Sequence, residues 1–236
     1  MFTKFKVMAF PKMLSGLIRL VALALILQAC KIAYIPNTFN SPLLRNKGDA
    51  QLNIWAGSAG IEAQTAVAVT NSIGLMVNGQ LQQNKKTEND VEVTEQRKYV
   101  EGAIGYTERF SDMGIFEFYA GGGVGQVPAK FRSITWDGPQ TIAYNRWFIQ
   151  PALGFCNDWL DFSVVSRLSL VDIGPQKNWF YEPGIVGKIG YKRLRFVGCF
   201  GLSIPLREHD KRYWDNLPFT ISIGLHLNFG KRIVEN

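Results

Sequence analysis

The sequence has few of the residues that build metal centres or disulfide frameworks. Its 236 residues include three cysteines and two histidines. His209 falls in a predicted loop and His226 in a predicted strand, so the chain has no two-histidine spacing for a metal ion. Cys156 and Cys199 fall on strands that are not predicted to be neighbours. We therefore expect two small buried thiols there, although export would make a disulfide chemically possible.

Excess positive charge is also small once the first segment is set aside. The formal net charge is +7, but residues 1–29 carry four basic residues and no acidic one. The rest of the chain is therefore only +3, which is too little to indicate a nucleic-acid surface. We expect no nucleic acid among the partners.

No apolar run is long enough for a transmembrane helix. The longest, residues 17–27, follows basic residues and reads as a signal peptide over residues 1–29. The sequence Leu27-Gln-Ala-Cys30 resembles the bacterial lipoprotein signal, in which the cysteine becomes the lipidated first residue. The resemblance implies a lipid on Cys30, and simple cleavage is the alternative. Residues 30–47 have two prolines and no period, so we expect a tether between the lipid and the next domain.

The strongest pattern in the chain is the alternation over Phe219–Phe229. Large apolar residues occupy one face of this stretch, and small or polar residues occupy the other, as in a half-buried strand. Its length suits a tilted strand that crosses a bilayer. The remaining strands repeat this design. The fold class predicted for residues 48–230 is all-β, an up-and-down antiparallel transmembrane β-barrel of about ten strands, with eight possible, and residues 231–236 form a tail.

The predicted connections alternate in length after the first hairpin. We expect ten strands, at about 49–57, 60–70, 72–83, 97–110, 114–127, 141–156, 159–171, 183–191, 194–204 and 217–229. Longer loops are expected at 84–96, 128–140, 172–182 and 205–216. An up-and-down membrane barrel has short periplasmic turns and longer outer loops in this way. Pro151 interrupts its strand, so we expect a bulge there.

Two features decide which face of the strands points outward. The polar face is rich in glycine and alanine, which suit a narrow interior better than a water-facing surface. Outward-facing aromatic residues are predicted to gather at the short-turn end, as in an interfacial belt. These are Tyr106, Phe110, Phe116, Phe155, Phe162, Tyr191, Phe196 and Phe229. A soluble barrel with an apolar interior is the alternative.

Charged side chains of both signs are predicted to face the lumen. Inside a barrel they have to pair or stay hydrated. We expect a structural salt-bridge network, and a narrow polar path for solutes is the alternative. Its predicted members are Glu62, Glu101, Arg109, Glu117, Arg167, Lys188, Arg195 and His226.

No arrangement of residues indicates catalysis. Ser222 and His226 share a face, but both point inward, so we expect no enzyme activity and no cofactor. Gly121–Gly125 lacks the lysine and hydroxyl residue of a phosphate loop and does not open a helix. These glycines are expected to let Tyr99 or Arg109 lie flat against the wall.

The predicted outer loops mix cations with aromatic residues. They could bind lipopolysaccharide phosphates, sugars or partner proteins, or they could simply be solvated. The candidate contacts are Trp136, Trp179, Tyr181, Arg207 and Trp214.

Taken together, residues 48–230 resemble the small outer-membrane β-barrel proteins of Gram-negative bacteria. Phe229 resembles the aromatic residue that ends the signal read by the barrel-assembly machinery, although a short tail follows it. The resemblance implies contact with membrane lipids and an outer-membrane location, with the N-terminus on the periplasmic side. We expect a structural or interaction protein that binds through its outer loops. A narrow solute channel and a soluble, lipocalin-like periplasmic carrier are the alternatives.

Overall fold

The structure is a computed structural model that describes residues 32–88, 91–129, 140–173, 176–191, 193–207 and 215–230. Regular secondary structure in these residues is entirely β. Among them, no helix has the length and apolar character needed to cross a membrane.

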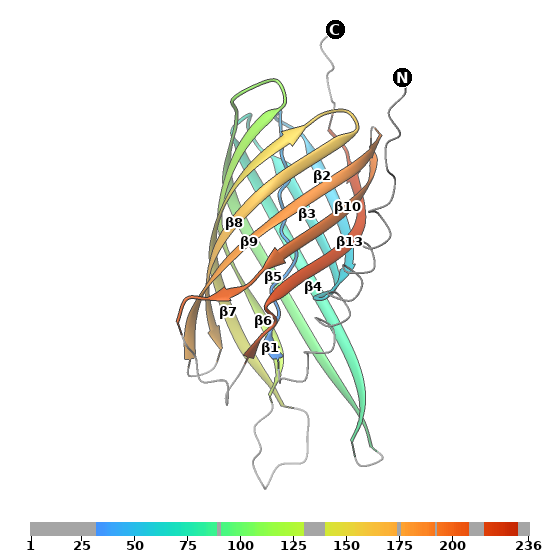
Figure 1. Ribbon diagram of the computed structural model, residues 1–236, viewed down its shortest axis with the longest axis vertical. Helices are drawn as coiled ribbons and strands as arrows, with labels where there is room; N and C mark the ends of the chain where they lie inside the picture. Colours follow the sequence, from blue (N-terminus) through green and yellow to red (C-terminus); the bar gives the residue numbers. More distant parts are fainter. Residues whose placement is uncertain are drawn as a thin grey trace, which may run out of the picture.

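Ten long strands form a closed, antiparallel, up-and-down β-barrel in the described part of the chain (Figure 1). Each strand pairs with its neighbours in sequence order, and β13 pairs with β2 to close the ring. The predicted barrel of ten strands is therefore confirmed. The strands are β2 (Ala50–Gly57), β3 (Gly60–Ala68), β4 (Ile73–Glu88), β5 (Val91–Arg109), β6 (Gly114–Ala129), β7 (Gln140–Cys156), β8 (Leu160–Ile173), β9 (Gln176–Tyr191), β10 (Leu194–Leu202) and β13 (Phe219–Asn228).

Three short strands lie outside this ring of ten. Strand β1 (Ile32–Tyr34) pairs in parallel with β12 (Asp215–Asn216), and β11 (Ile204–Pro205) continues the pairing of β9. All three lie at the end of the barrel where β4 meets β5 (Figure 1). We call this the long-hairpin end. The opposite end, where β3 meets β4 and β5 meets β6, is the short-turn end.

The apolar face of the strands points outward, and the polar face points into the barrel. In β13, Ile223 is 71% exposed and Leu225 is 46% exposed, whereas Ser222 and His226 are buried. Seven of the eight aromatic residues predicted to face outward at the short-turn end are exposed, among them Phe196 at 70% and Phe110 at 64%, and Phe116 is half-buried. The assignment of the two faces is therefore confirmed.

Two of the predicted loops are strands instead. Most of the segment 84–96 belongs to β4 and β5, which pair from Ile73–Tyr106 out to Glu88–Val91. Most of the segment 172–182 belongs to β8 and β9. The backbone ladder continues where the apolar alternation stops, because cross-strand pairing does not need an apolar face. Alternation therefore predicted the apolar part of each hairpin and missed its extension.

Pro151 does not cause the predicted bulge. The register between β7 and β8 is the same on both sides of it, from Ile149–Leu168 to Ala152–Val165. The ladder to β8 is only interrupted there, and the pairing of Pro151 with Phe118 on β6 is continuous. The missing main-chain N–H of Pro151 is thus accommodated without the extra residue of a β-bulge.

The segment before β2 lies inside the barrel. Residues 34–44 are all buried, and they run through the lumen from the long-hairpin end to the short-turn end (Figure 1). We call residues 34–47 the luminal segment. The sequence predicts residues 30–47 as a tether between the lipid and the barrel, and it does not predict this threaded path. A single extended segment without a ladder has no period in its sequence, so alternation cannot reveal it.

Candidate functional site

The luminal segment and the inward-facing side chains around it form the candidate site. At the long-hairpin end, Tyr34 lies in an apolar cluster with residues from β5 to β9, including Tyr144 and Phe180. Its hydroxyl donates to Glu182 at 2.8 Å and accepts from Nη1 of Arg146 at 3.1 Å. The ring of Tyr34 thus closes one end of the lumen, and its hydroxyl begins a polar network.

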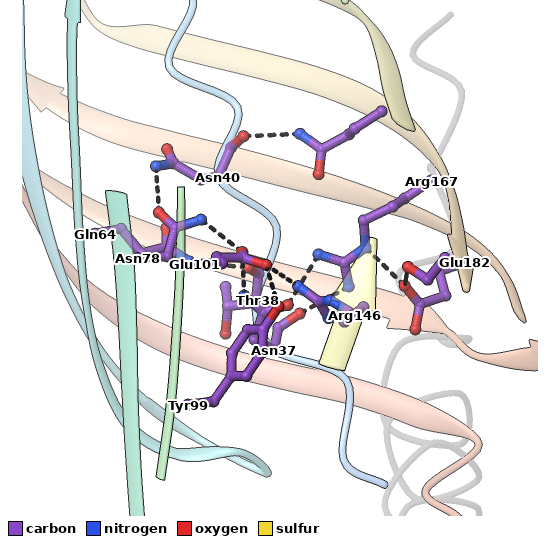
Figure 2. A network of polar contacts seen from close by, with 12 residues as sticks. Asn37, Thr38, Asn40, Gln64, Asn78, Tyr99, Glu101, Arg146, Arg167 and Glu182 are labelled. Carbon is purple, nitrogen blue, oxygen red and sulfur yellow. Dashed lines mark hydrogen bonds and ion pairs between the residues drawn. The ribbon is translucent and has the colours of Figure 1, made fainter. Parts of the chain in front are cut away.

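Asn37 joins two buried ion pairs in the middle of this network (Figure 2). One pair is Arg146–Glu101, and the other is Arg167–Glu182, with 2.7 Å between Nε and Oε2. Asn37 donates from Nδ2 to Glu101 at 2.7 Å and accepts from Nη1 of Arg167 at 3.0 Å. Its main-chain oxygen accepts from Nη2 of Arg167 at 3.1 Å. One neutral side chain therefore links a carboxylate to the guanidinium of the other pair.

Thr38 faces the opposite wall, where it supplies hydrogen-bond donors to the buried carboxylate of Glu62. Its amide donates to both carboxylate oxygens at 3.1 Å, and its hydroxyl contacts Glu62 and Ser222. Gln64 donates to the main-chain oxygen of Thr38 at 2.8 Å, and it accepts from the indole of Trp55 at 2.9 Å. Glu62 thus receives its donors from the luminal segment, as a buried carboxylate requires.

Nearer the short-turn end, Glu117 and Lys188 also bond to the luminal segment. The Leu43 amide donates to Glu117 at 2.6 Å, and the Ser41 hydroxyl donates to it at 3.1 Å. Nζ of Lys188 donates to the main-chain oxygen of Pro42 at 3.3 Å. Arg45 lies at the short-turn end, beyond the buried part of the segment. Its Nη2 donates there to the main-chain oxygens of residues 112 and 156 at 3.0 and 2.9 Å.

Inward-facing glycines make room for the apolar side chains of the luminal segment. Gly184 and Gly201 are paired across β9 and β10, and a Cβ at either position would meet the ring of Phe39. The guanidinium of Arg167 lies 4.5 Å from the centre of that ring, within cation–π distance. A Cβ at Gly154 would likewise meet Leu43. These glycines therefore form part of the surface on which the luminal segment lies.

Seven of the eight residues predicted for the luminal network lie in the lumen. Glu62, Glu101, Glu117, Arg167, Lys188, Arg195 and His226 are buried. Arg195 pairs with Asp161 at 2.8 Å, and Nδ1 of His226 lies 2.7 Å from Asn53. The prediction that Arg109 faces the lumen is wrong, because this residue is exposed. It is the last residue of β5, where the strand reaches the end of the barrel and an inward parity no longer means burial.

Sequence reasoning missed Arg146 and Glu182 as network members. Arg146 shares the inward face of β7 with Gln150, so strand parity could have identified it. Glu182 fell in a segment predicted as a loop. Of the two side chains predicted to lie over Gly121–Gly125, Tyr99 approaches one glycine: a Cβ on Gly123 would come within 2.5 Å of its hydroxyl oxygen. Arg109 is exposed at the end of β5.

The predicted loop contacts lie in different places. Trp136 and Trp214 are outside the described residues. Trp179 and Tyr181 are not in a loop, because both belong to β9 and point outward, each 39% exposed. Arg207 is exposed at the long-hairpin end, and its main-chain oxygen accepts from Asn178 at 3.1 Å.

The serine and the histidine that share a face of β13 each contact another buried side chain. Ser222 contacts Thr38, and His226 contacts Asn53. Cys156 and Cys199 are buried free thiols. Among the described residues, no group of three or more histidine, cysteine, aspartate or glutamate side chains could hold a metal ion.

A second feature is an apolar hollow of about 750 Å³ on the outer wall. Gly102 and Gly122 line the hollow without side chains. Trp147 and Trp179 line it as well, together with aliphatic side chains of β5, β7 and β8. Its lining is almost entirely apolar, so it offers contact area but no polar group that would select a ligand.

Comparison with known proteins does not assign the chain. No protein-family model matches it, and a search of curated proteins finds no significant match.

Proposed function

We propose that this protein is an outer-membrane β-barrel lipoprotein with a structural or interaction role, closed by its own luminal segment and binding through its long-hairpin end. The observation that carries the proposal is the distribution of side chains. Large apolar residues such as Ile223 and Phe196 are exposed around the barrel, while ion pairs such as Arg167–Glu182 are buried inside it. A barrel in water would need the reverse arrangement, and lipid explains the observed one.

Membrane fractionation tests this proposal directly. The protein is expected to stay in the membrane pellet after a carbonate wash and to migrate faster in an unheated detergent gel than after boiling. Palmitate labelling that is lost in a Cys30→Ala variant would support the lipid anchor. Release of the folded protein by carbonate without detergent would refute the membrane location and favour a soluble carrier.

The filled lumen argues against the solute-channel alternative. Residues 34–44 are buried along the whole path, and the pocket at the short-turn end, beside Pro42 and Asp49, holds only about 20 Å³. That is about the size of one probe sphere for water. The purified protein in planar bilayers is therefore expected to give no discrete conductance steps. Regular steps from the intact chain would restore the channel hypothesis.

The same contents argue against a carrier of apolar ligands. Such a carrier needs an apolar cavity. Here the centre of the lumen holds Asn37, Thr38 and the charged groups to which they bond. A ligand would have to displace these contacts and leave buried charges without partners, which costs several kcal/mol for each charge.

The long-hairpin end is the proposed contact surface. The paired strands β4 and β5 extend farther at this end than the other described strands (Figure 1). Exposed cations at this end include Lys177, which pairs with Asp172 at 3.0 Å, and Arg207. Such cations suit anionic partners, among them the phosphates of lipopolysaccharide.

Paired charge removals at the two ends test this surface. A Lys177→Ala/Arg207→Ala variant is expected to bind lipopolysaccharide several-fold more weakly at low salt. An Arg109→Ala/Arg193→Ala variant, which removes two exposed cations at the short-turn end, is the matched control and is expected to bind like the wild type. Equal losses in both variants would mean that binding reflects net charge and not the long-hairpin end.

A further inference from the structure

The luminal segment separates the start of the mature chain from the start of the barrel. Tyr34 lies at the long-hairpin end, where its main-chain oxygen accepts from Leu217 at 2.9 Å. Lys47 lies at the short-turn end, where its amide donates to Asn71 at 2.9 Å. The segment therefore crosses the full length of the barrel before β2 begins and crosses back.

Hydrogen bonds along the whole length of the lumen fix the direction in which the luminal segment runs. Tyr34 bonds Glu182 near one end, Asn37 bonds Glu101 in the middle, and the Leu43 amide bonds Glu117 near the other end. A reversed or withdrawn segment would leave these three buried carboxylates short of donors, and a buried carboxylate that loses a donor is destabilised. The path through the lumen is thus part of the fold.

Covalent geometry limits how far Cys30 can lie from this end. Cys30 lies outside the described residues, but it precedes Ile32 by only two residues, and two residues span at most about 7 Å. Ile32 pairs with Asp215 in the small β1–β12 sheet at the long-hairpin end. A lipid on Cys30 therefore cannot reach the short-turn end, the side on which the sequence pattern alone predicts it together with the periplasmic turns.

We propose that the lipid anchor on Cys30 sits in the outer leaflet, on the same side of the membrane as the long hairpins and opposite the short turns. This inference rests on the proposed function, because it needs a membrane-spanning barrel and a lipidated cysteine. Short polar turns mark the periplasmic end of such barrels. The threaded segment then carries the mature N-terminus across the membrane to the cell surface.

Three single cysteines on intact cells test the inference. Lys31→Cys reports the anchor, Arg207→Cys reports the long-hairpin end, and Asp112→Cys reports the short-turn end. Arg207 and Asp112 are exposed, while the native Cys156 and Cys199 are buried and give the background. A membrane-impermeant maleimide is expected to label the first two variants in intact cells, and Asp112→Cys only after the outer membrane is permeabilised.

Each other outcome has a defined meaning. Labelling of Lys31→Cys that follows Asp112→Cys instead of Arg207→Cys would overturn the threaded path. Labelling of Asp112→Cys alone in intact cells would place the short turns outside and the anchor in the inner leaflet, which also overturns the inference. Failure of the proposed function is seen separately, as release by carbonate or absence of palmitate on the wild-type chain.

Discussion

Replacing Asn37 with alanine is expected to lower the free energy of unfolding by about 3–6 kcal/mol. The change removes two hydrogen bonds to charged groups: the donation to Glu101 at 2.7 Å and the acceptance from Arg167 at 3.0 Å. Buried bonds of this kind contribute about 1.5–3 kcal/mol each. Alanine has no side-chain donor for Glu101 and no acceptor for Arg167, and water has little access to this part of the lumen.

The structure limits the loss to those two bonds. The ion pairs Arg146–Glu101 and Arg167–Glu182 remain, and so does the bond from Arg167 to the main-chain oxygen of residue 37 at 3.1 Å. Breaking an ion pair would add an unpaired buried charge and a larger penalty. The expected effect is therefore a clear loss of stability without loss of the fold.

Urea unfolding in detergent micelles, followed by tryptophan fluorescence, measures this change. Lys47→Ala is the matched control, because Lys47 belongs to the same segment but has an exposed side chain. Its effect is expected to stay within about 0.5 kcal/mol. A loss below about 1 kcal/mol for Asn37→Ala would refute the placement of Asn37 between Glu101 and Arg167.

Two further substitutions probe how the luminal segment packs. Gly201→Leu would collide with the Phe39 ring and is expected to destabilise the barrel by at least about 1–3 kcal/mol, whereas a Cβ at the nearby Gly198 meets nothing within 4 Å. Equal urea midpoints for Gly201→Leu and Gly198→Leu would contradict the packing of the ring. Phe39→Ala is expected to cost about 3–5 kcal/mol, because Phe39 is fully buried. Phe200→Ala, on the outer wall, is expected to cost about 1 kcal/mol by the same measurement. A larger loss of stability for Phe200→Ala than for Phe39→Ala would contradict the assignment of Phe39 to the inside and Phe200 to the outside of the barrel.

The strands of the barrel could be predicted because their signal is local. Along most of each strand an inward residue and its outward neighbour differ in burial, as Ser222 and Ile223 do in β13. Each strand therefore carries its own evidence, and ten strands give the barrel. The prediction weakened at strand ends, where Arg109 leaves the closed interior and where β4 and β5 continue beyond the apolar region.

The luminal segment could not be predicted in this way because its partners are spread around the whole wall. Asn37 meets residues of β5 and β8, and Thr38 meets residues of β3 and β13. Its asparagines, serine and prolines have the composition of a loop. One signal was present in the strands themselves, since inward glycines such as Gly154 and Gly201 provide more space than the strand side chains fill. That space indicated an occupant without identifying it.

Threading also sets an order of assembly. The ring closes between the first and last long strands, β2 and β13. The last strand bonds to the luminal segment as well, through Thr220 to the main-chain oxygen of Pro36 at 3.0 Å and through Ser222 to Thr38 at 2.7 Å. A ring that closed first would have to admit residues 34–47 lengthwise through one of its ends, past the ion pairs and carboxylates to which they bond. We therefore expect the wall to wrap around this strip of chain before β2 and β13 join, so that the strip serves as a template for the final seam.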